Sequence, residues 1–205
     1  MEQPVLNKEN KESKKIDLKE ALFGAPVRRQ LLFDCVQGYL TNRRQGTVKV
    51  KSRGEVRGST RKIYKQKGTG NARHGDIKAG IFVGGGIIFG PKPREWNHKL
   101  SKNAKRQALI TALSLRRKEG NLTVVEAIPC DEIKTKKMAV QLAKWGFEKG
   151  LVIVGKPEGA LLKSIRNIPD VTLVSADQVM ALDIIRCEKI MMTEDAVGLL
   201  EQRLL

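Results

Sequence analysis

The sequence of 205 residues predicts an α/β fold, with a mostly parallel sheet of about four strands covered by helices and interrupted by a long extended loop. Two observations predict this arrangement. Beyond residue 100, short continuous apolar runs alternate with helical segments, which is typical of a parallel sheet buried on both faces. Between Arg43 and Arg106, the chain instead holds 18 Lys and Arg residues, only three acidic residues and eleven of its 19 glycines.

The chain before the basic stretch predicts one helix and a tail. Apolar residues across Ala25–Asn42 recur at the spacing of one helix face, and Pro26 suits a first helical turn. Residues 1–15 carry no apolar run, so we expect a short polar tail there rather than a secretory signal. The expected organisation is a single globular domain over residues 16–205, interrupted by the loop at residues 43–100.

The chain after the basic stretch predicts the sheet. Ser101 suits the N-cap of a helix that reaches about Lys118 and ends at Gly120. Four apolar runs then predict the strands: Leu122–Val125, Leu151–Val154, Val171–Val174 and Lys189–Met192. The expected helices between or after them are Thr135–Gly146, Glu158–Arg166, Ala176–Leu182 and Glu194–Arg203. The helix over Ala25–Asn42 is expected to pack on the same sheet.

The charge distribution indicates a polyanionic partner. The formal net charge is +17, and the basic stretch alone carries +15 of it. Clustered Lys and Arg bind nucleic acids because they release counterions from the phosphate backbone. A membrane partner is not expected, because the longest apolar run, Ile81–Pro91, is short and interrupted by three consecutive glycines.

The composition of the basic stretch favours folded RNA. Glycine lets the backbone approach phosphates closely, and guanidinium groups bind phosphate and stack on bases. Several side chains suit stacking on unpaired bases: Tyr64, His74, Phe82, Trp96 and His98. The alternative is a merely solvated charge run. We favour it less, because such runs are normally terminal and low in complexity, and this one is internal and varied.

Four motifs in the stretch carry a family resemblance. They are RQGT (Arg44–Thr47), SRGEVRG (Ser52–Gly58), QKGTGNARHG (Gln66–Gly75) and GGGIIFGPKPR (Gly84–Arg94). Together with KLSKNAKRQALITALS and the late MTEDAV, they resemble in order and spacing the L-four family of large-subunit ribosomal proteins, of bacterial or organellar type. The resemblance extends from about Ile16 to the C-terminus.

The resemblance implies a structural constituent of the cytoplasmic ribosome, without enzymatic activity, cofactor or metal. Its implied partners are large-subunit (23S-type) rRNA, neighbouring large-subunit ribosomal proteins and the nascent polypeptide. The loop tip would help form the narrow part of the exit tunnel, with Gln66, Lys67, Gly68, Thr69 and Gly70 nearest its wall. The implied rRNA-binding residues are Arg43, Arg44, Lys49, Lys51, Arg53, Arg57, Arg61, Lys62, Lys65, Lys67, Arg73, Lys78, Lys92, Arg94 and Lys99.

Some positions depart from the family pattern. Tyr64-Lys65 stands where the family usually has Trp-Arg, Asn71 replaces an Arg, Asp76 a Ser, and Phe82-Val83 another Trp-Arg. The loop therefore lacks several guanidinium groups and gains a carboxylate, so individual phosphate or stacking contacts are expected to differ.

An enzyme is the main alternative, because α/β sheets often hold nucleotides at the carboxyl ends of their strands. Gly150–Pro157 resembles a P-loop, but Pro157 stands where a Ser or Thr is needed, and the preceding residues are typical of a strand. The three cysteines are odd in number, widely spaced and set among apolar residues, so we expect them to be reduced core residues. A nucleophilic role is not expected, since the α/β portion beyond the loop has no histidine to act as their base.

Two further alternatives concern metals and unspecific binding. His74 and His98 are the only histidines, and neither has a cysteine at metal-ligand spacing, so a zinc site is not expected. A generic nucleic-acid-binding protein or RNA chaperone stays open. It would bind many polyanions with similar affinity, governed mainly by salt.

Overall fold

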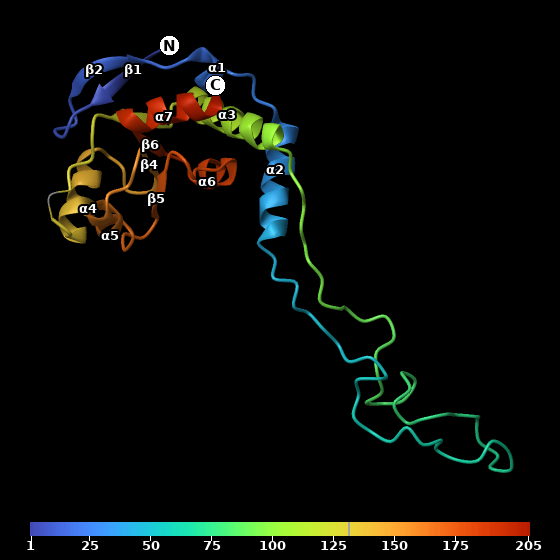
Figure 1. The fold of residues 1–205 in the computed structure, drawn as a ribbon. Helices are drawn as coiled ribbons and strands as arrows, with labels where there is room; N and C mark the ends of the chain where they lie inside the picture. The colour runs from blue at the N-terminus through green and yellow to red at the C-terminus, as the bar shows by residue number, and fades with distance from the viewer. Residues whose placement is uncertain (131) are drawn as a thin grey trace. The chain divides into compact units, whose positions relative to one another are not determined.

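A computed structural model describes residues 1–130 and 132–205 of the chain and contains a mixed α/β fold (Figure 1). In the described residues the sheet has six strands in the order β2-β1-β3-β6-β4-β5. Neighbouring strands run parallel except β1 and β2, which form an antiparallel pair. The strands are β1 (Glu2–Leu6), β2 (Glu12–Asp17), β3 (Leu122–Val125), β4 (Gly150–Val154), β5 (Val171–Ser175) and β6 (Ile190–Thr193).

The mostly parallel α/β sheet is confirmed, but the expected number of about four strands is wrong. The two additional strands lie in the N-terminal segment that was expected to be a polar tail. Val5 is fully buried and pairs with Val124 of β3, whereas most residues of β2 are exposed at the sheet edge. An edge hairpin with one buried side chain has no apolar run, which is why the sequence pattern concealed it.

The described residues contain seven helices, most of them where the sequence predicts them. Ser101 caps α3 by accepting a 3.1 Å hydrogen bond from the backbone N–H of Ala104, and Gly120 follows the helix with a φ of 74°. The helices are α1 (Glu20–Phe23), α2 (Arg29–Asn42), α3 (Lys102–Lys118), α4 (Thr135–Lys144), α5 (Gly159–Ile165), α6 (Ala181–Arg186) and α7 (Glu194–Leu204).

Two helix starts differ from the prediction. The helix α2 begins at Arg29 rather than near Ala25, whose backbone N–H donates instead to the hydroxyl of Ser114 on α3 at 3.1 Å. The helix α6 spans Ala181–Arg186 rather than the predicted Ala176–Leu182, and its start is capped by the carboxylate of Asp183, which accepts a 3.0 Å hydrogen bond from the N–H of Met180.

The core has two layers, one on each face of the sheet. Helices α4 and α5 cover one face with Met138, Leu142 and Leu161. On the other face α7 contacts β4 and β6, and side chains of α1, α2, α3 and α6 complete the core there. Residues along β4 alternate between the layers, so that Ile153 belongs to one core and Val154 to the other. This is the buried, apolar pattern of a central parallel strand. The P-loop-like segment is thus a strand, as the sequence predicts.

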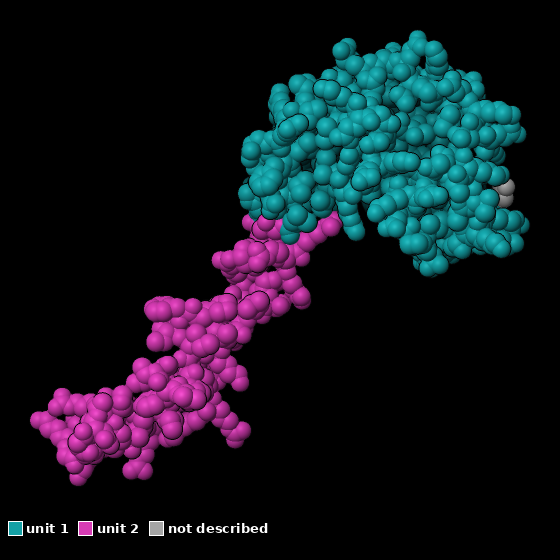
Figure 2. All heavy atoms as spheres, turned by 180° about the vertical axis from the view of Figure 1, so that it is seen from behind, with its two compact units in different colours: residues 1–40, 98–205 teal, residues 41–97 magenta. Residues whose placement is uncertain are grey.

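The chain divides into two compact units, which Figure 2 colours separately. The α/β unit comprises Met1–Leu40 and His98–Leu205, and the basic unit comprises Thr41–Asn97. The buried core residues all belong to the α/β unit. No residue between 43 and 101 lies in a helix or strand, so the short strand-like runs of the basic unit form none. Across the described residues, no helix has the length and apolar character needed to span a membrane.

Candidate nucleic-acid interface

The basic unit concentrates positive charge without a core of its own. Its sequence contains 14 Lys and Arg residues against Glu55, Asp76 and Glu95. It contains all the predicted rRNA-binding residues except Lys99, which is exposed in the α/β unit. Such a unit presents cations to a polyanion rather than packing them internally.

Backbone hydrogen bonds join the two halves of the basic unit. The N–H of Arg94 donates to the carbonyl of Gly46 at 3.1 Å, and the N–H of Val50 donates to Pro91 at 3.2 Å. Further along, the N–H of Ile87 donates to Lys51 at 3.0 Å. These bonds are isolated and form no continuous ladder. The unit is therefore a folded-back chain whose backbone leaves many polar groups for a partner.

The predicted tip residues lie in the turn that connects the two halves. Two hydrogen bonds connect the chain before this turn to the chain after it. The N–H of Ile63 donates to the carbonyl of Gly75 at 2.9 Å, and the hydroxyl of Tyr64 donates to the carbonyl of Ala72. Gly68 and Gly70 have φ values of 83° and 71°, a conformation that glycine adopts without strain. Lys67 lies between these contacts and is exposed.

Most of the predicted rRNA-binding cations are exposed, and three differ from the rest. Lys49 pairs with Glu55 at 2.7 Å, and Arg53 pairs with Asp76 at 3.2 Å. Lys78 is only 8% exposed, so its side chain is largely covered by the unit itself. Among the described residues, no carboxylate pairs with the exposed ones: Arg43, Arg44, Lys51, Arg57, Arg61, Lys62, Lys65, Lys67, Arg73, Lys92, Arg94 and Lys99.

The two carboxylates in these pairs have structural roles. Glu55 accepts hydrogen bonds from Lys49 and from the backbone N–H of Ser52, and these bonds lower the pKa of Glu55 to about 2. Asp76 is buried. One of its carboxylate oxygens accepts a hydrogen bond from Arg53, and the other has no hydrogen-bond partner among the described residues. Asp76, which stands where the family usually has Ser, therefore pairs with Arg53 and occupies its guanidinium group.

Aromatic side chains of the basic unit contact other side chains of the same unit. His74 packs edge-to-face against Phe82 at a centroid distance of 5.0 Å and lies 6.4 Å from Tyr64. Trp96 lies under the guanidinium groups of Arg44 and Arg94. From the sequence, these four aromatic residues were expected to stack on unpaired bases. Their contacts with other side chains of the basic unit were not predicted.

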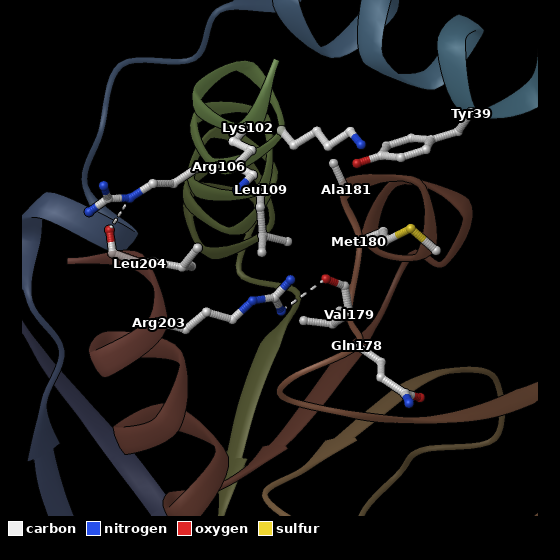
Figure 3. A pocket seen from close by; sticks show the side chains of 11 residues that line it. Tyr39, Lys102, Arg106, Leu109, Gln178, Val179, Met180, Ala181, Arg203 and Leu204 are labelled. Carbon is white, nitrogen blue, oxygen red and sulfur yellow. Dashed lines mark hydrogen bonds between the residues drawn. The ribbon is translucent and has the colours of Figure 1, made fainter. Parts of the chain in front are cut away.

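The α/β unit also contains a basic cavity of about 590 Å³, whose lining residues were not among those predicted from the sequence (Figure 3). Tyr39 and Leu109 contribute to its apolar wall, and Arg203 is fixed by hydrogen bonds from its Nη1 to the carbonyls of Ala176 and Val179 at 2.7 and 3.2 Å. The available signal was the spacing of three cations on the first turns of α3, which places them on one helix face: Lys102, Lys105 and Arg106.

Two of the three thiols lie in surroundings that disfavour a nucleophilic role. Burial raises the pKa of Cys35 and of Cys187, which disfavours their thiolate forms. Cys35 is buried, as expected, whereas Cys130 and Cys187 are only partly covered. Among the described residues, no group of three or more His, Cys, Asp or Glu side chains is placed to hold a metal ion.

Comparison with known proteins identifies the family. Residues 16–203 match the Ribosomal protein L4/L1 family. The chain belongs to this family. It is 41% identical over 198 residues to "Large ribosomal subunit protein uL4" of Thermoanaerobacter sp., covering 97% of this chain and 96% of that protein. Proteins of the same name from Magnetococcus marinus and Symbiobacterium thermophilum are 41% and 42% identical, covering 98% of both chains in the first case, and 97% of this chain and 96% of the relative in the second.

Proposed function

We propose that this protein is a structural component of the large subunit of the cytoplasmic ribosome. In this proposal the basic unit penetrates large-subunit rRNA as an extended loop. Its tip, Gln66–Gly70, contributes to the narrow part of the nascent-peptide exit tunnel. The α/β unit contacts neighbouring ribosomal proteins. The names of the related proteins support the assignment to the large subunit.

The main support for the proposal is that the clustered cations and the hydrophobic cores lie in different units of the chain. The α/β unit contains the buried apolar residues, and the basic unit contains 14 of the cations, most of them exposed and without a carboxylate partner among the described residues. A surface of this kind gains free energy mainly by neutralising phosphates and releasing counterions. Its glycines allow close approach of the backbone to a folded RNA.

An enzymatic function has less support. The relatives named above are ribosomal proteins. The carboxyl ends of β3, β4 and β6 are followed by Glu126, Gly155 and Glu194, and in the described part of the chain no strand is followed by a glycine-rich phosphate-binding turn. The generic nucleic-acid binder is the competing function, and it differs from the proposal in selectivity.

The test is binding of the purified full-length chain to large-subunit rRNA fragments, with small-subunit rRNA and duplex DNA as competitors, over a series of salt concentrations. The proposal predicts a preference for one large-subunit region that persists at moderate salt. Equal affinity for all three nucleic acids, lost in parallel as salt rises, would instead identify a generic polyanion binder.

A further inference from the structure

Trp96 lies at the centre of a cationic cluster in the basic unit. The guanidinium carbons of Arg44 and Arg94 each lie over its indole, 3.6 Å from the ring centroid. This distance is well inside the range in which a cation is attracted to the face of an aromatic ring. Guanidinium groups suit the arrangement, because they are planar and weakly hydrated. We call this cluster the Arg44–Trp96–Arg94 stack.

The backbone around the stack is in direct contact across the two halves of the unit. The N–H of Arg94 donates to the carbonyl of Gly46, and Gly46 has a φ of 66°. A Cβ atom at position 46 would overlap the carbonyl oxygen of Arg94 and would lie 2.9 Å from Cδ1 of Trp96. Only glycine permits this close approach of the two backbones, which brings Arg44, two residues before Gly46, near Trp96.

The stack borders a hollow with the electrostatics of an anion site. The hollow has a volume of about 700 Å³ and is lined by Arg44, Lys92 and Arg94, together with the polar side chains of Gln45 and Thr47. No carboxylate lines it, and among the described residues none pairs with either arginine of the stack. Three cations facing one hollow repel each other, and an anion placed there removes the repulsion.

Stacking also determines which surface of each guanidinium group is available. The ring covers a face of the group, whereas the N–H donors project in its plane and stay free for an acceptor. A phosphate group offers several oxygen acceptors to such donors, and its pairs with guanidinium groups are frequently bidentate. A phosphodiester of RNA therefore matches the hollow in charge and in hydrogen-bonding pattern.

We propose that Trp96 is a positioning residue that holds Arg44 and Arg94 as a preformed receptor for a phosphodiester group of RNA. The inference rests on the proposed function, because it takes RNA as the ligand of the basic unit. Trp96 then acts through the two arginines and not by stacking on a base, which is the role that the sequence suggested for it.

The test compares aromatic substitutions in the full-length chain by affinity for a large-subunit rRNA fragment at several salt concentrations. Trp96→Leu removes the ring but keeps both arginines, so we expect affinity to fall about 5- to 30-fold, the value of two cation–π contacts. Because the cations are retained, the dependence of log affinity on log salt should keep its slope. Trp96→Phe should restore part of the loss, since it keeps a smaller aromatic face.

Two controls separate positioning from other roles. Phe89→Leu removes a ring of the same unit that is 97% exposed, and it should bind like the wild type. Arg44→Ala and Arg94→Ala remove phosphate contacts directly, so each should reduce the magnitude of the salt slope by roughly 1. The positioning role is wrong if Trp96→Leu keeps full affinity, if the Leu and Phe variants are equally weak, or if Trp96→Leu changes the slope as an arginine deletion does.

A measurement without RNA keeps this inference separate from the proposed function. The chain has two tryptophans, and Trp145 is only 7% exposed in the α/β unit, so quenching by acrylamide reports mainly on Trp96. Replacing both stack arginines by alanine should increase the quenching, and an unchanged quenching curve would disprove the stack. Failure of the wild type to prefer large-subunit rRNA would disprove the proposed function instead.

Discussion

Deletion of Gly46–Asn97 tests the separation between core and charge most severely. The deleted segment contains 12 basic and three acidic residues, so the formal net charge falls from +17 to about +8. Gly46 and Arg94 are hydrogen-bonded to each other, so a linker of about four Gly and Ser residues can close the gap. No residue of either hydrophobic core is removed, and replacing 52 loop residues by four favours folding by about 2 kcal/mol of loop-closure entropy.

The effect on RNA binding can be estimated from the exposed cations. Nine exposed, predicted rRNA-binding residues without a carboxylate partner lie in the deleted segment: Lys51, Arg57, Arg61, Lys62, Lys65, Lys67, Arg73, Lys92 and Arg94. If each neutralises one phosphate, the slope of log affinity against log salt decreases in magnitude by roughly 6 to 8. Filter binding over a salt series measures the slope, and thermal unfolding by circular dichroism measures the fold. An unfolded variant would show that the core depends on the basic unit, and a folded variant with the wild-type slope would show that the basic unit does not bind the RNA.

Three further predictions concern single residues of the basic unit. Lys67→Glu should change the slope for free rRNA by no more than roughly 2, yet alter the passage of nascent chains in ribosomes that contain it; weak binding to free rRNA would contradict a tip role. Hydrogen bonds lower the pKa of Glu55 to about 2, so its pairing with Lys49 should persist above that pH and be lost as pH falls through 2. Titration of the Glu55 carboxyl followed by NMR should show this midpoint, and the midpoint should move to higher pH in the Lys49→Gln variant. Asp76→Ser frees the guanidinium group of Arg53, so the salt slope should steepen by roughly 1, and an unchanged or shallower slope would show that Arg53 contacts no phosphate.

The sequence predicted the central strands and most helices because their signals are local. Continuous apolar runs such as Leu151–Val154 are typical of strands in the middle of a parallel sheet, which are buried on both faces. Ser101 indicated the start of α3 because serine is a preferred N-cap residue, and its hydroxyl accepts the expected hydrogen bond from the N–H of Ala104. The start of α6 was misplaced because the deciding hydrogen bond, from Met180 to Asp183, depends on a side-chain geometry that periodicity does not report.

The strands β1 and β2 were missed for a different reason. An edge hairpin buries few side chains, and only Val5 is fully buried in β1. A signal was nevertheless present in the turn, where Asn7 accepts hydrogen bonds from the N–H groups of Glu9 and Lys11, and Asn10 has a φ of 63°. Asparagine at such positions is typical of tight turns, so Asn7 and Asn10 together indicated a turn between two strands.

Within the basic unit, the sequence indicated which residues are charged but not which charges are occupied. The Arg53–Asp76 and Lys49–Glu55 pairs, and the burial of Lys78, depend on how the two halves of the unit meet. The Arg44–Trp96–Arg94 stack likewise joins residues about 50 positions apart. No local pattern specifies such contacts, because they arise from the fold of an irregular chain that has no period of its own.

Cross-linking in translating ribosomes tests the proposal that the turn at Gln66–Gly70 reaches the exit tunnel. A photoreactive amino acid replaces Lys67 in ribosomes that are translating a stalled, labelled nascent chain. The control carries the same group at Val140, an exposed residue of α4. We expect cross-links from position 67 to large-subunit rRNA and to the nascent chain, and none to the nascent chain from position 140. Cross-links from position 67 to neither, in ribosomes that have incorporated the protein, would contradict it.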